Sequence, residues 1–131
     1  NSLCEGDLFK VAICKYPVLD LYDMYQNTHR FEKGYLNSLV GEYSKFRNEY
    51  QLRSPINKIT ELKKPILLFQ GKKDLVISYK QSLKIQEELR RNNKNSEVIF
   101  FDNEGHGFKN IDNKKTVLLK SQKFLEKTLN I

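Results

Sequence analysis

Three short apolar runs constrain the fold of this chain more than any other feature of its sequence. They lie at residues 9–16 (FKVAICKY), 66–70 (ILLFQ) and 96–101 (SEVIFF), and longer segments of helical character separate them. An apolar run of this length is typical of a strand that is buried on both faces of a parallel sheet. Strands that alternate with helices across short connections predict an α/β fold with right-handed crossovers.

The segment between the first two runs is mostly helical in character. Within residues 20–52 the aromatic residues Tyr43, Phe46 and Tyr50 occur at helical spacing, and we expect their rings to lie in the core. Pro55 ends this region, because the residue before a proline avoids the helical conformation.

Two later helices have candidate caps. The spacing of Ser78 and Gln81 indicates a capping box that opens a helix reaching about Arg91. Asp112 is expected to cap a last helix that reaches Leu129. The apolar residues of that last helix that are available for the core are Val117, Leu118, Phe124, Leu125 and Leu129.

The number of strands indicates an incomplete sheet. Three apolar parallel strands would leave one long hydrophobic edge without a partner. The first residues, Asn1 to Asp7, include no initiator methionine and no signal-peptide pattern. We therefore expect residues 1–131 to form about half of a larger domain.

Composition and charge exclude some classes of partner. The net charge is +7, but the lysines are scattered and no arginine-rich stripe interleaves with aromatic residues. We expect a solvated basic surface and no nucleic-acid partner. No apolar run approaches the roughly 20 residues of a membrane-spanning helix, so no membrane partner is expected. Cys4 and Cys14 lack metal-ligand spacing, and Cys14 lies in an apolar run, which favours a reduced, cytoplasmic protein.

Two groups that can do chemistry follow the ends of predicted strands. Asp74 comes after ILLFQ and Gly71, and His106 lies in Gly-His-Gly after SEVIFF. Ligands and catalytic groups gather at the carboxyl ends of parallel strands, so the carboxylate and the imidazole are expected to meet there. A histidine that activates a serine hydroxyl needs a carboxylate to hold its tautomer and to stabilise the imidazolium. Each motif alone has a simpler interpretation: an aspartate at a strand end is often a turn former, and most surface histidines have no catalytic role.

Four blocks of sequence resemble the prolyl oligopeptidase family of serine peptidases, and most of all its acylaminoacyl peptidase and dipeptidyl peptidase branch. The block THRFEKGYLNSLVG at 28–41 is the most specific of them, because other α/β hydrolases usually lack it. The remaining blocks are residues 9–21, residues 53–74 and Gly105-His106-Gly107-Phe108.

The resemblance implies a Ser-Asp-His triad in which Asp74 is the acid and His106 the base. It also implies the C-terminal half of an α/β-hydrolase fold, with about three parallel strands flanked by helices. Residues 1–131 would be the C-terminal portion of a single catalytic domain, without the half that bears the nucleophile and without any N-terminal propeller. No Gly-x-Ser-x-Gly motif occurs in the sequence, so the 131 residues alone are expected to be inactive. The resemblance implies no metal and no organic cofactor.

The chain departs from the family pattern at several positions. Ser78 stands where the family commonly has a proline, which affects a helix start and leaves the acid unchanged. Leu75 and Val76 follow the acid, where some members have an arginine that contacts the substrate carbonyl. The segment from Thr28 to Glu32 has two interpretations, a wall of the substrate pocket or a packing insertion.

Three functions are compatible with these features. The first is a serine peptidase that hydrolyses short peptides or acyl-peptides, with a homo-oligomeric intact protein. The second is a carboxylesterase or dienelactone-hydrolase-like enzyme, which would share the fold and the positions of the acid and the base. The third is a non-catalytic dimerisation module that uses the unpaired sheet edge.

Overall fold

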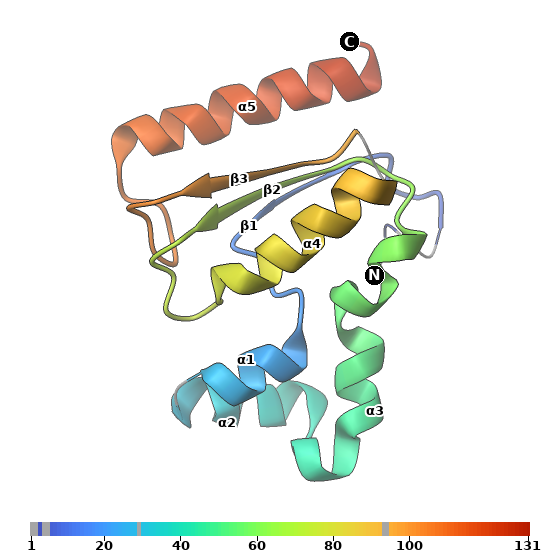
Figure 1. The fold of residues 1–131 in the computed structure, drawn as a ribbon, viewed down its shortest axis with the longest axis vertical. Helices are drawn as coiled ribbons and strands as arrows, with labels where there is room; N and C mark the ends of the chain where they lie inside the picture. Colours follow the sequence, from blue (N-terminus) through green and yellow to red (C-terminus); the bar gives the residue numbers. More distant parts are fainter. Residues whose placement is uncertain (1–2, 4–5, 29, 93–94) are drawn as a thin grey trace.

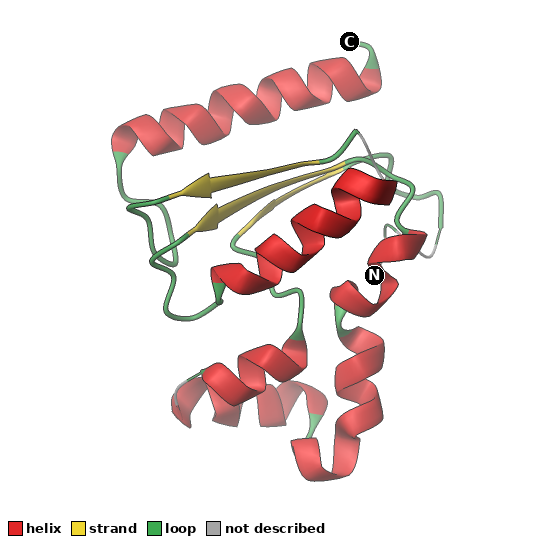
Figure 2. Cartoon of the chain, viewed as in Figure 1, coloured by secondary structure: helices red, strands yellow, loops and turns green. Residues whose placement is uncertain are grey.

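The chain forms three layers, with a parallel sheet between helices. The computed structural model describes residues 3, 6–28, 30–92 and 95–131. Strands β1 (Ala12–Lys15), β2 (Ile66–Gly71) and β3 (Glu97–Phe101) pair in the order β1-β2-β3, and both pairings are parallel. The helices are α1 (Leu21–Asn27), α2 (Arg30–Val40), α3 (Tyr43–Arg53), the 3-10 helix η1 (Pro55–Glu61), α4 (Tyr79–Asn92) and α5 (Ile111–Leu129). Figure 1 shows α4 on one face of the sheet and α5 on the other, and Figure 2 shows the same layers by secondary structure.

The alternation of side chains along β2 builds both halves of the core. Leu68 packs in a cluster with Ile85 and Leu89 of α4. Leu67, which points to the opposite face, packs in a second cluster with Phe124 of α5. Every residue of β2 is buried, as expected for the central strand of a sheet that is covered on both faces. The predicted α/β class with three parallel strands is therefore confirmed.

The helices α1 to α3 form a separate group beside the sheet (Figure 1). Tyr50 is fully buried there, and its hydroxyl group donates to the carbonyl oxygen of Gly41 at 3.0 Å. The prediction that Phe46 lies in the core is wrong, because its side chain is 46% exposed. Phe46 has non-helical backbone angles (φ −117°, ψ 31°), so the helix is kinked there and helical periodicity no longer places its ring inward.

The capping box predicted for α4 is wrong. The Ser78 hydroxyl does accept a hydrogen bond from the N–H of Lys80, at 3.4 Å. The side chain of Gln81, however, points to α1, where its oxygen accepts from the backbone N–H groups of Leu19 at 3.0 Å and Asp20 at 2.9 Å. A partner 62 residues away in sequence has therefore replaced the local partner that the motif predicts.

The last helix begins earlier than predicted. Asn110 is its N-cap and accepts from the N–H groups of Asp112 and Asn113, so Asp112 lies in the first turn and is not the cap. Phe124 is buried as expected, whereas Leu118 is 70% exposed, which contradicts its predicted place in the core.

The sheet has an exposed edge, as predicted. Among the described residues, β1 pairs with β2 alone, and three of its four residues are half-buried. No helix in the described ranges is long and apolar enough to cross a membrane.

Candidate active site

Asp74 lies in the loop between β2 and α4 and is surrounded by hydrogen-bond donors. Its side chain is fully buried. Oδ1 accepts from the backbone N–H groups of Val76 at 2.9 Å and Ile77 at 2.8 Å. Oδ2 accepts from Nε2 of Gln70 at 3.1 Å. A buried carboxylate requires such partners to offset its desolvation, and this set also fixes the plane of the carboxylate.

His106 lies in the loop between β3 and α5 and meets Asp74. Its Nδ1 is 3.1 Å from Oδ2 of Asp74. The ring of Tyr16, the residue directly after β1, lies 4.7 Å from the imidazole ring between centroids, and Tyr16 also contacts Phe108 edge to face. Tyr16 has φ +40°, a conformation that a bulky residue rarely adopts. The strand ends of β1, β2 and β3 thus contribute to one cluster.

Backbone contacts hold the two loops together. The N–H of Lys72 donates to the carbonyl of Phe101 at 2.9 Å, and the N–H of Lys73 donates to the carbonyl of Glu104 at 2.9 Å. Gly71 is required for this approach, because a Cβ at that position would overlap the carbonyl group of Glu104. The distance between Asp74 and His106 therefore depends on main-chain geometry as well as on their own contact.

The arrangement leaves one ring nitrogen available for chemistry. An ionised Asp74 can only accept, so Nδ1 of His106 carries the proton and donates to it. Nε2 then has a free lone pair, and the side chain is 40% exposed, so a hydroxyl group could reach it. The pair can therefore act as an oriented base that takes a proton at Nε2. In the described ranges, no group of three or more histidine, cysteine or carboxylate residues could hold a metal ion.

The sequence matches the prolyl oligopeptidase family over residues 2–131. The chain belongs to this family. Its curated relatives include the "Uncharacterized peptidase YtmA" of Bacillus subtilis (strain 168), which is 28% identical over 100 residues, or 76% of this chain and 39% of that protein. The "Dipeptidyl aminopeptidase BIII" of Pseudoxanthomonas mexicana is 31% identical over 77 residues, or 59% of this chain and 11% of that protein.

Solved structures of related peptidases share the fold. A Mycobacterium tuberculosis puromycin-hydrolyzing peptidase superimposes with a TM-score of 0.87 at 30% identity, over 98% of this chain and 20% of that one. The chain thus spans well under half the length of the relatives it matches. The predicted resemblance and the α/β-hydrolase type of fold are confirmed by these matches.

The structure brings together the two residues that the sequence singled out, Asp74 and His106, but the residues that support them were not predicted. Gln70 and Glu104 are buried polar residues with several hydrogen bonds each, and neither was predicted. The only available signal for Gln70 was a polar residue at the end of an apolar run. Tyr16 was predicted only as the last residue of a strand.

Three buried or half-buried serines, Ser54, Ser82 and Ser96, make structural hydrogen bonds. The Ser54 hydroxyl donates to the carbonyl of Tyr50 at 2.6 Å. The Ser82 hydroxyl donates to Oε1 of Gln70 at 3.4 Å, and Ser96 accepts from the N–H of Ile66 at 3.0 Å. His29 and Cys4 lie outside the described residues.

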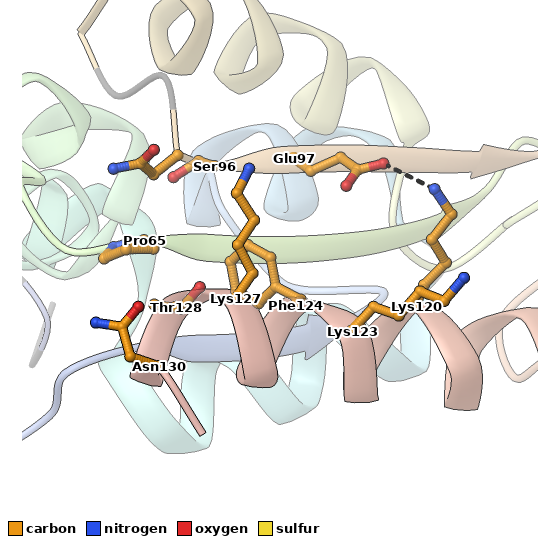
Figure 3. Close-up of a pocket in the computed structure, with 10 residues that line it drawn as sticks. Pro65, Ser96, Glu97, Lys120, Lys123, Phe124, Lys127, Thr128 and Asn130 are labelled. Atoms are coloured by element: carbon orange, nitrogen blue, oxygen red, sulfur yellow. Dashed lines mark hydrogen bonds and ion pairs between the residues drawn. The ribbon is translucent and has the colours of Figure 1, made fainter.

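A cavity of about 490 Å³ lies between the beginning of β3 and the end of α5 (Figure 3). Its lining includes Pro65, Ser96, Glu97, Lys120, Lys123 and Lys127. Pro65 and Ser96 directly precede β2 and β3, so this cavity lies at the amino ends of the strands, whereas Asp74 and His106 follow their carboxyl ends. It is not part of the candidate active site.

Proposed function

We propose that this chain supplies the acid and the base of a serine peptidase, with Asp74 as the triad acid and His106 as the general base. The contact of 3.1 Å between Nδ1 of His106 and Oδ2 of Asp74, at the carboxyl ends of adjacent parallel strands, carries the proposal. Membership of the prolyl oligopeptidase family supports it.

The nucleophile in this proposal lies outside the 131 residues. The sequence contains no Gly-x-Ser-x-Gly motif, and the chain corresponds to a minor part of each relative. We therefore propose that residues 1–131 form the C-terminal portion of a single α/β-hydrolase catalytic domain, and that the isolated chain is inactive.

The proposed reaction is an acyl transfer in two halves. The serine oxygen attacks the substrate carbonyl carbon while its proton passes to Nε2 of His106, and Asp74 stabilises the resulting imidazolium. His106 then returns the proton to the leaving amine as the carbon–nitrogen bond breaks. In the second half, water attacks the acyl carbon while its proton passes to Nε2 of His106. His106 then returns this proton to the serine oxygen as the ester carbon–oxygen bond breaks, which releases the carboxylic acid and the free serine.

The proposed substrates are short peptides or acyl-peptides. The names of two relatives, a dipeptidyl aminopeptidase and a puromycin-hydrolyzing peptidase, support hydrolysis of small amides over hydrolysis of esters. A homo-oligomeric intact protein and a cytoplasmic location remain predictions from the sequence.

Labelling by a fluorophosphonate probe tests the proposal in the full-length protein. We expect one serine outside these residues to be labelled, and labelling to be largely lost in His106→Ala. His29→Ala, which replaces the other histidine of the sequence, is the matched control and should label normally. Labelling that is undiminished in His106→Ala would refute the role of the base. If no serine is labelled, the non-catalytic module is favoured. Turnover of aminoacyl anilides and of nitrophenyl esters is then compared, because a peptidase hydrolyses the anilides whereas an esterase hydrolyses only the esters.

A further inference from the structure

We propose that Glu104 is a positioning residue for His106, because its carboxylate closes the loop that carries the imidazole. This inference rests on the proposed function, in which His106 is the general base. Glu104 is only 3% exposed and takes no part in the proton transfers described above.

The Glu104 side chain bridges the two ends of the histidine loop. Oε2 accepts from the backbone N–H of Lys109 at 2.9 Å, and Oε1 accepts from the backbone N–H of Asn110 at 2.9 Å. Oε1 also accepts from the side-chain amide of Asn113, in the first turn of α5, at 2.9 Å. Residues 105–108, which include His106, therefore form a small loop whose two ends are joined by one carboxylate.

The same hydrogen bonds favour the ionised carboxylate. The bond from the Lys109 N–H contributes most, and together with the bonds from Asn113 and Asn110 it holds the pKa of Glu104 below its usual range. Glu104 is thus a carboxylate at neutral pH, with oxygen atoms that can only accept. An amide or a shorter side chain would satisfy fewer of the three donors.

The main chain of Glu104 connects the histidine loop to the aspartate loop. Its carbonyl accepts from the N–H of Lys73, the residue directly before Asp74, at 2.9 Å. Gly71 allows this close approach, since any Cβ there would overlap the Glu104 carbonyl. One residue therefore fixes the loop internally with its side chain and sets its distance from the acid with its carbonyl group.

The sequence around His106 makes this support necessary. Gly105 and Gly107 flank the histidine, Gly107 has φ +91°, and glycine restricts the backbone less than any other residue. Among the described residues, the imidazole itself has one hydrogen bond, to Asp74, and a ring contact with Tyr16. Phe108 anchors the loop by packing edge to face against Tyr16 and Phe101, and the Glu104 carboxylate adds the hydrogen bonds that join the two ends of the loop. Loss of the carboxylate would therefore let Nε2 move relative to the nucleophile.

The expected effect follows from the sensitivity of catalysis to geometry. A displacement of about 1 Å in a reacting group can lower a rate by about 100-fold. We expect Glu104→Ala to lower the rate constant of fluorophosphonate labelling, and kcat, by about 10- to 100-fold with little change in KM. Glu104→Gln keeps one acceptor oxygen and should recover part of that loss.

Asp102→Asn is the matched control in the same loop. Asp102 is also a carboxylate, but its side chain is 76% exposed and it pairs with Lys72 at 2.6 Å on the surface. Its removal should change the labelling rate by less than about 2-fold, as expected for an exposed ion pair.

The experiment measures both the number of reactive sites and the rate per site in the full-length protein. The labelled fraction at saturation counts folded active sites, and the rate constant reports the position of the base in those sites. A role in folding alone would lower the labelled fraction and leave the rate constant of the remaining sites unchanged, and that result in Glu104→Ala or Glu104→Gln would overturn the proposal. His106→Ala is measured in the same experiment. If His106→Ala labels at the wild-type rate, the proposed function fails. If His106→Ala loses labelling while Glu104→Ala labels at the wild-type rate, only the role of Glu104 is refuted.

Discussion

The substitution Asp74→Asn tests the proposed triad most directly, because the donors around Asp74 dictate how an asparagine must lie. Oδ1 faces the backbone N–H groups of Val76 and Ile77, so the amide oxygen has to occupy that position. The NH2 group then replaces Oδ2 and faces Nε2 of Gln70 and Nδ1 of His106. Two donors would oppose each other at the glutamine, at a cost of about 1–3 kcal/mol to the free energy of unfolding.

The consequence for catalysis is a change of tautomer. An amide NH2 group donates to Nδ1 of His106, so the ring proton moves to Nε2, which can no longer accept the serine proton. The same exchange in an established Ser-His-Asp triad lowers kcat by about 10⁴-fold. At 1.36 kcal/mol for each factor of ten, this corresponds to about 5.5 kcal/mol of activation free energy.

The assay is the rate constant of fluorophosphonate labelling in the full-length protein, compared with Asp102→Asn as the exposed control. The expected cost in stability is checked by urea unfolding, so that a loss of folded protein is separated from a loss of rate. If Asp74→Asn labels at more than about a tenth of the wild-type rate while folded, Asp74 does not orient the base, and the triad assignment is wrong.

Three further predictions concern other parts of the chain. Gln81→Leu removes the acceptor of two backbone N–H groups that precede α1, and it should lower the free energy of unfolding, measured by urea denaturation, by about 2–4 kcal/mol. The control Gln86→Leu, on the same helix, loses one hydrogen bond of 3.5 Å and should lower that free energy by less than about 1 kcal/mol. Glu104 has a lowered pKa, so the stability that it contributes is present above the ordinary titration range of a glutamate and is lost as the pH falls toward the lowered value. Glu104→Gln should therefore reduce the dependence of Tm on pH between about pH 5 and pH 3. Equal slopes of Tm against pH in the variant and the wild type would contradict this. Burial raises the pKa of the Cys14 thiol. In a Cys4→Ser background, alkylation of Cys14 by iodoacetamide at about pH 8 should therefore be slower than alkylation of free cysteine. An equal rate would show that the thiol is accessible and unperturbed.

The sequence by itself determined the class of fold, the order of its elements and the pair of residues that meet in the candidate site. Apolar runs and helical spacing reflect burial, which acts on every residue of an element, so the three strands and the end of α3 before Pro55 were predicted correctly. Asp74 and His106 were found because parallel strands place their carboxyl ends at one edge, and the structure brings these residues within 3.1 Å.

Only the tertiary structure decided the partners of individual polar side chains. Gln81 matches the local sequence pattern of a capping box, yet its side chain bonds across 62 residues to the chain before α1. The buried N–H of Leu19 and the partly buried N–H of Asp20 need an acceptor there. Phe46 and Leu118 have suitable spacing but are exposed. At Phe46 the cause is a kink in α3, which interrupts the helical periodicity. Glu104 carries no sequence signal of its role, because its three donors are specified by how the loop meets α5. Periodicity is a local property, whereas the pairing of a buried polar group depends on distant segments that meet only in the folded chain.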